Sequence, residues 1–410
     1  MEIKGFEFSR LPRVHFGSGA FAGIGRVMAG LGRTVLVVTG GRSLLASGRL
    51  DLLWKALRHE SLAPFQVTAS GEPSPESVDL AVAQCRGRDI QAVLAVGGGS
   101  VIDAGKAISA MLPGGGSVFD YLEGVGTGAR HSGRKLPFVA VPTTAGTGSE
   151  ATKNAVLSRT GPSGFKKSLR HENFIPDVAV IDPQLSLTCP APLTAACGMD
   201  AFTQLLESYL STKASPLTDA LALSGIEAIG GSLVQACSDG AGDEKVRGRM
   251  AYGAFLSGVT LANAGLGLVH GLASAVGGVR EIPHGVVCGT LMGAVNAATI
   301  RKLLDREGPG HPALRRFARV GALLGGVEWG SVAARCRLLV EEAEPEDLAA
   351  GCRLLTETLD RWTETLRMPR LGAFGVREAD LDRIVAATDN KCHPLPLEPH
   401  EIREILLTRL

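Results

Sequence analysis

Short runs of β-forming apolar residues recur through the first half of the chain and constrain its fold more than any other feature. Most of them lead directly into glycine or proline, and the segments between them have helical spacing. Strands that are apolar on both faces are typical of parallel sheets covered by helices on both sides. Residues 1–185 are therefore predicted to form an α/β domain with a mostly parallel sheet. The predicted strands are Thr34–Thr39, Phe65–Ala69, Ala92–Val96, Phe138–Val141 and Val178–Asp182.

The pattern changes near Pro190, where strand signals end and apolar residues begin to recur at helical spacing almost to the C-terminus. A chain of 410 residues is longer than one core usually organises, so two domains are expected. We place the boundary at Leu185 and predict an all-α domain over residues 186–410. The longest uncharged stretch, Ala251–His270, contains several hydroxyl and amide groups, which favours one buried core helix over a membrane span.

Composition narrows the class of protein. The 42 Lys and Arg residues nearly balance the 41 Asp and Glu residues, for a formal net charge of +1. Without a basic run, neither nucleic acid nor a membrane is expected as a partner. The charged N-terminal dozen residues do not resemble a secretory signal. The eight cysteines form no C-x-x-C motif and are interpreted as buried, reduced thiols of a cytoplasmic protein.

A glycine-rich loop follows the predicted strand at Ala92–Val96. It contains Gly97, Gly98, Gly99 and Ser100, and a helical pattern begins immediately afterwards. Glycines let the backbone turn tightly and approach a ligand, and the free N–H groups at a helix start attract an anion. A turn without a ligand is the alternative. The strand–loop–helix context favours a site for the pyrophosphate of a dinucleotide.

A second polar loop, Pro142–Glu150, also follows a predicted strand. Thr143, Thr144 and Thr147 make it dense in hydroxyl donors, although the same residues could serve only to cap a helix. Ligands bind to open α/β sheets at the carboxyl ends of the strands, where both loops are expected. Together the loops predict a nucleotide site.

The helical half contains potential metal ligands. Gln204 lies four residues after Asp200 and hence on the same helical face, while His284 follows a proline that favours a helix start. His270 lies late in the long apolar stretch. Each histidine alone is more often a hydrogen-bonded core or surface residue. One carboxylate and two imidazoles in a strongly apolar domain nevertheless suit Zn²⁺ or Fe²⁺, with a position open for a substrate oxygen.

Over essentially its whole length the sequence resembles the iron-containing, or group III, alcohol dehydrogenase family. The resemblance implies a dinucleotide-binding N-terminal domain, a metal-holding helical C-terminal domain like that of dehydroquinate synthase, and a reaction in the cleft between them. It also implies a homodimer in which edge strands near the N-terminus pair. The stretches that carry it are Leu11–Gly17, Gly97–Lys106, Pro142–Glu150, Ile175–Pro183 and Asn263–Gly285.

The family holds its divalent metal with one aspartate and three histidines. Asp200, His270 and His284 match three of these positions, and Gln204 occupies the fourth. An amide oxygen is a poorer ligand than imidazole, so metal occupancy and identity, Fe²⁺ or Zn²⁺, stay open. Ser274 stands where a further histidine of the family often supplies a proton relay.

Cofactor choice depends on the end of the first strand. NAD-specific members of the family usually have an aspartate there, whereas this chain continues from Thr39 through Gly40, Gly41, Arg42 and Ser43. Loss of the carboxylate removes repulsion of a 2′-phosphate, and Arg42 with Ser43 could bind that group, unless Arg42 is only a solvated surface residue. NADP(H) is favoured, and NAD(H) remains open.

These features predict hydride transfer between nicotinamide and a small alcohol or aldehyde, with a metal near His270 and His284 stabilising the alkoxide-like oxygen. Asp103 and Lys106 complete the first loop's motif unless they form an ordinary surface pair. Alternatives are a metal-free reductase like maleylacetate reductase, a lyase like dehydroquinate synthase, and a catalytically inactive binding protein. The cofactor-binding candidates are Gly40, Gly41, Arg42, Ser43, Gly97, Gly98, Gly99, Ser100, Asp103, Thr143, Thr144, Thr147 and Lys166.

Overall fold

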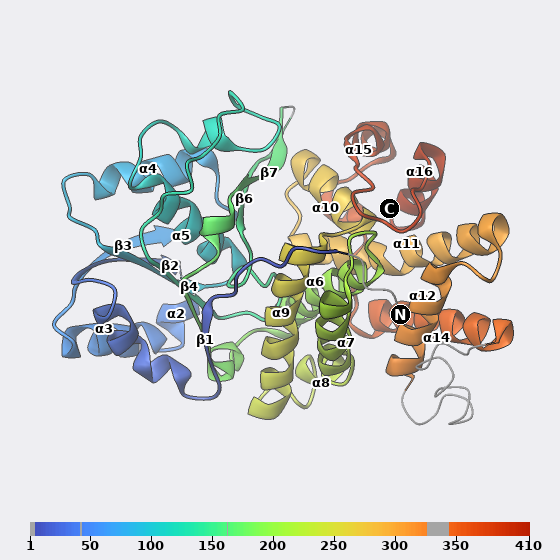
Figure 1. The fold of residues 1–410 in the computed structure, drawn as a ribbon, viewed down its shortest axis with the longest axis horizontal. Coiled ribbons are helices and arrows are strands. Elements are labelled where there is room, and N and C mark those ends of the chain that lie inside the picture. The colour runs from blue at the N-terminus through green and yellow to red at the C-terminus, as the bar shows by residue number, and fades with distance from the viewer. Residues whose placement is uncertain (1–4, 42, 162, 326–343) are drawn as a thin grey trace.

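A computed structural model describes residues 5–41, 43–161, 163–325 and 344–410. Figure 1 shows an α/β part, blue to green, beside a helical part that runs from green to red. The first half and the second half of the sequence therefore fold into visibly different architectures, as predicted.

The α/β part is built on a six-stranded sheet in which every pairing is parallel. All five predicted strands are present within a residue or two of their expected bounds, and a short edge strand, β1, is added. From one edge to the other the order is β1 (Arg13–Phe16), β8 (Val178–Ile181), β5 (Phe138–Pro142), β4 (Ala92–Gly97), β2 (Thr34–Gly40) and β3 (Ala63–Ala69).

Helices cover both faces of this sheet. Val35 and Val37 of β2 belong to one core, which is shared with α1 (Ile24–Ala29) and α3 (Arg49–His59). The alternate residue Leu36 belongs to the opposite core, because successive side chains of a strand point to opposite faces. Burial on both faces explains why the strands read as continuous apolar runs. The helices of the second core are α4 (Pro75–Cys85) and α5 (Gly99–Met111), and a short helix α2 (Ser43–Ala46) follows β2.

An antiparallel hairpin of β6 (Asn154–Arg159) and β7 (Phe165–Arg170) was not predicted. Its strands have only one apolar face: Ala155 and Leu157 are buried, while their neighbours are partly exposed. A rule based on continuous apolar runs therefore does not detect it.

The second half is helical in every described element after β8. The long helix α6 is largely buried and contacts α7, α9 and α11. It therefore forms the middle of the helical part. The helices are α6 (Ala191–Leu210), α7 (Pro216–Gly230), α8 (Leu233–Ala236), α9 (Glu244–Ala264), α10 (Leu268–Val279), α11 (His284–Glu307), α12 (Pro312–Leu324), α14 (Pro345–Thr365), α15 (Leu381–Ala387) and α16 (Pro399–Thr408).

The expected single helix over Ala251–His270 is wrong, because the chain breaks between α9 and α10. Gly265 has a φ of 73°, a backbone conformation that favours glycine. A Cβ at Gly267 would lie 2.9 Å from a carboxylate oxygen of Glu207. The axes of the two helices differ in direction by 98°. In the described part of the chain no single helix is long and apolar enough to span a membrane, and only this bent pair has the required length and hydropathy when its two helices are taken together. The break places His270 in the first turn of α10.

Candidate metal centre and nucleotide loops

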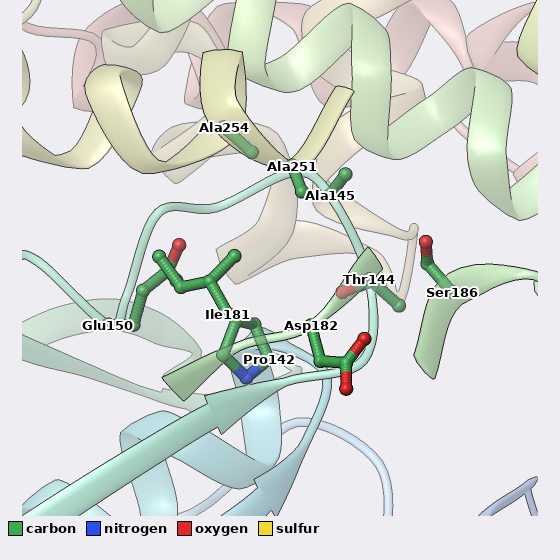
Figure 2. A pocket seen from close by; sticks show the side chains of 9 residues that line it. All are labelled: Pro142, Thr144, Ala145, Glu150, Ile181, Asp182, Ser186, Ala251 and Ala254. Carbon is green, nitrogen blue, oxygen red and sulfur yellow. The ribbon is translucent and has the colours of Figure 1, made fainter. Parts of the chain in front are cut away.

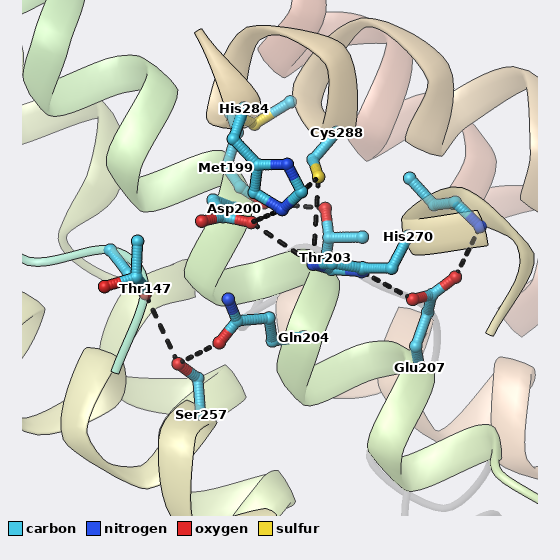
Figure 3. A network of polar contacts seen from close by, with 12 residues as sticks. Thr147, Met199, Asp200, Thr203, Gln204, Glu207, Ser257, His270, His284 and Cys288 are labelled. Carbon is cyan, nitrogen blue, oxygen red and sulfur yellow. Dashed lines mark hydrogen bonds and ion pairs between the residues drawn. The ribbon is translucent and has the colours of Figure 1, made fainter. Parts of the chain in front are cut away.

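Four side chains from three helices meet inside the helical part (Figure 3). They are Asp200 of α6, His270 of α10, and His284 and Cys288 of α11. One ligand atom from each lies within 4.8 Å of all the others. Asp200, His270 and Cys288 are buried and His284 is partly exposed. Three of these residues were predicted as metal ligands, whereas Cys288 was interpreted only as a buried thiol.

The contacts converge on one point. The Asp200 Oδ1 atom lies 3.3 Å from His270 Nε2 and 3.8 Å from His284 Nε2. The Cys288 sulfur lies 3.7 Å and 3.8 Å from the same two nitrogens. His284 is the first residue of α11, after Pro283 at the N-cap, as predicted. Cys288 follows one helical turn later and so lies on the same face.

Glu207 fixes the orientation of His270. Its Oε2 atom lies 2.7 Å from His270 Nδ1, and its Oε1 atom accepts a hydrogen bond of 2.6 Å from the Val269 amide. A carboxylate that accepts the Nδ1 proton turns Nε2 toward the cluster, as in histidines that bind metals. Because the pKa of His270 is raised, Nε2 must release its own proton before it binds an ion. Glu207 was missed from the sequence, although it lies two helical turns after Asp200.

The protonation states reflect this burial. Burial lowers the pKa of His284 to about 3 despite the nearby Asp200, so its ring is neutral. Burial also disfavours the charged form of His270, but Cys288 and Glu207 outweigh it and raise its pKa well above the usual value. Burial would raise the pKa of Asp200, yet the two histidines hold it below its usual range. A carboxylate, two imidazoles and a thiol facing one point are a donor set that fits a divalent transition metal.

Gln204 and Ser274 lie close to this cluster. The Gln204 Oε1 atom lies 2.8 Å from the Ser257 hydroxyl, which donates to it, and Figure 3 shows the amide nitrogen on the side of Asp200. The Ser274 hydroxyl donates to the backbone carbonyl of His270. A ligand role for Gln204 stays a prediction.

The first glycine-rich loop joins β4 to α5 as expected. Gly98 is the N-cap residue of α5 and, as a glycine, has no side chain to cap the amides of this turn. A Cβ on Gly97 would lie 2.6 Å from Val101, so the tight turn itself requires glycine there. Ser100 follows in the first helical turn. Uncapped amides at a helix start suit an anion.

The two predicted loops lie against each other. The Thr143 amide donates to the Gly97 carbonyl at 2.9 Å. A Cβ on Gly98 would meet the Thr144 hydroxyl at 3.4 Å, and a Cβ on Gly99 would lie 2.5 Å from the Thr147 hydroxyl. The structure therefore brings together loops that are well separated in the sequence, and Gly99 is needed for that approach.

A small pocket is enclosed by the second loop, the carboxyl end of β8 and α9 (Figure 2). Burial raises the pKa of Glu150, one of its lining residues, to about 7. None of the four clustered metal-ligand candidates contributes to the pocket. It is lined by Pro142, Thr144, Ala145, Glu150, Ile181, Asp182, Ser186, Ala251 and Ala254.

Asp103 and Lys106 are both buried, so the alternative of a surface pair is wrong. Asp103 accepts a hydrogen bond from the Val156 amide. The Lys106 ammonium donates to the carbonyls of Ser149, Thr152 and Asn154. Both side chains connect α5 to the second loop and β6. A contact between Asp103 and the cofactor stays a prediction.

The remaining cofactor candidates are spread over β2, α2 and β7. Lys166 of β7 pairs with Glu72 at 2.5 Å and is almost buried. Gly40 ends β2, Gly41 follows it and Ser43 begins α2, while Arg42 lies outside the described residues. A role for Lys166 in cofactor binding and the phosphate-binding role of Ser43 stay predictions.

Comparison with known proteins accounts for both halves of the chain. The family model described as iron-containing alcohol dehydrogenase matches residues 12–183, and its C-terminal counterpart matches residues 194–407. Long-chain-alcohol dehydrogenase 1 of Geobacillus thermodenitrificans is 32% identical over 96% of this chain and 94% of its own length. The NAD-dependent methanol dehydrogenase of Bacillus methanolicus is 32% identical over 80% of this chain and 84% of its own length.

The fold agrees with these matches. A crystal structure of 1,3-propanediol oxidoreductase superposes with a TM-score of 0.85 at 28% identity, covering 99% of this chain and all of that one. Sequence and fold therefore agree along nearly the whole length of the chain. The chain belongs to the iron-containing alcohol dehydrogenase family.

Proposed function

We propose that this protein is a metal-dependent alcohol dehydrogenase that transfers hydride between NAD(P)(H) and a small alcohol or aldehyde. The observation that carries the proposal is the convergence of Asp200, His270 and His284 from three helices, with His270 oriented by Glu207. A metal-free reductase has no need of buried donors that face one another in this way. The cluster therefore favours the metal-dependent reaction over the maleylacetate reductase type.

Each part of the chain has a separate task in this proposal. Asp200 and the Nε2 atoms of His270 and His284 hold the metal. When bound, the ion supplies a Lewis acid that stabilises negative charge on the alcohol or carbonyl oxygen. The amides at the start of α5 bind the pyrophosphate, and Thr143, Thr144 and Thr147 position the nicotinamide half. Buried surroundings strengthen these electrostatic contacts.

The finer features of the proposal follow the sequence. We favour NADP(H) because Gly40 ends β2 where an acidic residue would repel a 2′-phosphate, although one relative is named NAD-dependent. The division at Leu185, a cytoplasmic location and a homodimer are parts of the same proposal. The polar lining needed for a phosphorylated polyol is not a feature of the largely apolar helical core around His270, which disfavours a dehydroquinate synthase-like lyase.

The test combines metal analysis with a panel of aldehydes and both reduced cofactors. Purified protein should reduce simple aldehydes, lose turnover to a chelator and regain it with Fe²⁺ or Zn²⁺. His270→Ala should lose both bound metal and turnover, whereas the exposed His59→Ala should lose neither. Turnover that is indifferent to chelator and to His270→Ala would replace this proposal with the metal-free reductase.

A further inference from the structure

The geometry points to Cys288 as a thiolate ligand that completes the metal site with Asp200, His270 and His284, and to Zn²⁺ as the ion that this site retains in preference to Fe²⁺. The inference rests on the proposed function in that it concerns the same centre. It goes beyond that function by assigning a ligand and an ion. The thiol proton is released to solvent when the sulfur binds the ion.

The distances agree with one ion bound by all four groups. Zn²⁺ binds sulfur at about 2.3 Å and nitrogen or carboxylate oxygen at about 2.0–2.2 Å, so tetrahedral ligand atoms lie about 3.3–3.6 Å apart. Four of the six separations between the donor atoms are 3.3, 3.7, 3.8 and 3.8 Å, and all six lie within 4.8 Å. Only a small contraction of side chains would bring every donor to bonding distance.

The position of Cys288 is specific to this cluster. Its sulfur lies beside both imidazole nitrogens and is fully buried. Cys352, a similarly buried cysteine of α14, instead donates to the Leu314 backbone carbonyl, which is an ordinary structural contact. Cys288 thus differs from a packing cysteine in what it faces.

Gln204 does not supply the missing donor in this arrangement. Its oxygen accepts a hydrogen bond from Ser257, and its amide nitrogen lies toward Asp200. An amide NH₂ group donates hydrogen bonds and offers no lone pair to a metal. Cys288, on the other side of Asp200, is the side chain that provides a fourth donor.

The sulfur decides the choice of ion. Soft thiolate ligands favour Zn²⁺, which tolerates mixed sulfur, nitrogen and oxygen coordination, whereas sites for single Fe²⁺ ions typically combine imidazole and carboxylate. Compared with a site made only of imidazole and carboxylate, a site that includes the Cys288 thiolate therefore favours Zn²⁺ over Fe²⁺. Co²⁺ adopts similar geometry and reports the ligand by its absorption spectrum.

The experiment titrates the metal-free full chain with Co²⁺ and records absorption, then measures metal content after incubation with equal Zn²⁺ and Fe²⁺ under anaerobic conditions. We expect a thiolate-to-cobalt charge-transfer band in the near ultraviolet for the wild type and for the control Cys352→Ser. The band should disappear in Cys288→Ser and Cys288→Ala. Zn²⁺ affinity should fall by roughly a hundredfold in both variants, the upper end of the loss seen when groups that only support ligands are removed.

Three results would overturn the inference: cobalt bands without charge transfer in the wild type, unchanged Zn²⁺ affinity in both Cys288 variants, or retention of Fe²⁺ over Zn²⁺. The charge-transfer band of the wild type is a measurement that needs no variant to fold. Metal-dependent turnover without the charge-transfer band would leave the proposed function standing and remove only the thiolate. A charge-transfer band together with turnover that is insensitive to chelator would support the thiolate ligand and remove the metal-dependent reaction.

Discussion

Replacing Glu207 by glutamine tests whether this residue positions His270 for metal binding. The substitution keeps the shape of the side chain but removes its negative charge. In the wild type one carboxylate oxygen lies 2.7 Å from His270 Nδ1, and the other accepts from the Val269 amide at 2.6 Å. Glutamine can accept only one of these hydrogen bonds, because its NH₂ group would face the second donor.

The expected loss follows from the two kinds of hydrogen bond. A hydrogen bond to a charged group contributes about 1.5–3 kcal/mol, and one between neutral groups contributes about 0.5–1.5 kcal/mol. The difference, about 1.5 kcal/mol, corresponds to about a tenfold weaker metal affinity. Losses of about 10–100-fold are typical when the carboxylate partner of a ligating histidine is removed.

The assay is a competition titration of Zn²⁺ against a chromophoric chelator, followed by kinetics at saturating metal. Glu207→Gln should bind Zn²⁺ about tenfold more weakly, and added metal should restore much of its kcat with little change in the KM for the cofactor. Glu357→Gln, an exposed glutamate of α14, is the control and should behave as the wild type. Unchanged metal affinity in Glu207→Gln would refute the orienting role.

Four further predictions concern other parts of the chain. Gly40→Asp should shift preference from NADPH toward NADH, since a Cβ there first meets Val101 at an ordinary 3.5 Å; equal ratios of kcat/KM before and after would contradict this. Burial raises the pKa of Glu150 from 4.5 to about 7, so its contribution to stability is present below pH 4.5 and is lost as pH rises through 7. Urea unfolding of Glu150→Gln should therefore show a gain of roughly 3 kcal/mol over the wild type above pH 7 and little gain at pH 4; parallel pH profiles would count against it. Light scattering should show a homodimer at micromolar concentration, since the edge strand β1 exposes Phe16, and a monomer would oppose that. Gln204→His should retain metal more firmly through a chelating column, because imidazole adds a strong donor; equal retention would speak against a site near residue 204.

The sheet could be predicted from the sequence because strands that are buried on both faces consist of continuous runs of apolar residues. Val35, Leu36 and Val37 are all fully buried although they serve two different cores. The hairpin of β6 and β7 leaves only an alternating pattern in short segments and was missed. The break at Gly265 was also missed, because apolar residues continue on both sides and glycines also occur inside the buried helix α9, so Gly265 and Gly267 did not stand out as a helix end.

The site could be predicted in part for a related reason. Aspartate and histidine are common metal ligands, so Asp200, His270 and His284 could be identified as candidates in an otherwise apolar domain. Cys288 and Glu207 acquire their roles only through contacts between α6, α10 and α11, and those contacts depend on helix register. Their spacing, one turn after His284 and two turns after Asp200, was the available signal.

A close contact between α9 and the second loop connects the two candidate nucleotide loops to the candidate metal centre. A Cβ on Gly148 would lie 2.4 Å from the Gly258 amide nitrogen, and one on Gly258 would lie 2.1 Å from the Gly148 carbonyl, so both positions require glycine. Ser257, next to Gly258, donates to Gln204, which lies one helical turn after Asp200. Thr147, next to Gly148, packs on Gly99 at the start of α5. The proposed hydride transfer requires reacting atoms to be held about 3–3.5 Å apart, and these contacts are how the fold would hold the proposed cofactor loops and the proposed metal ligands in fixed relation.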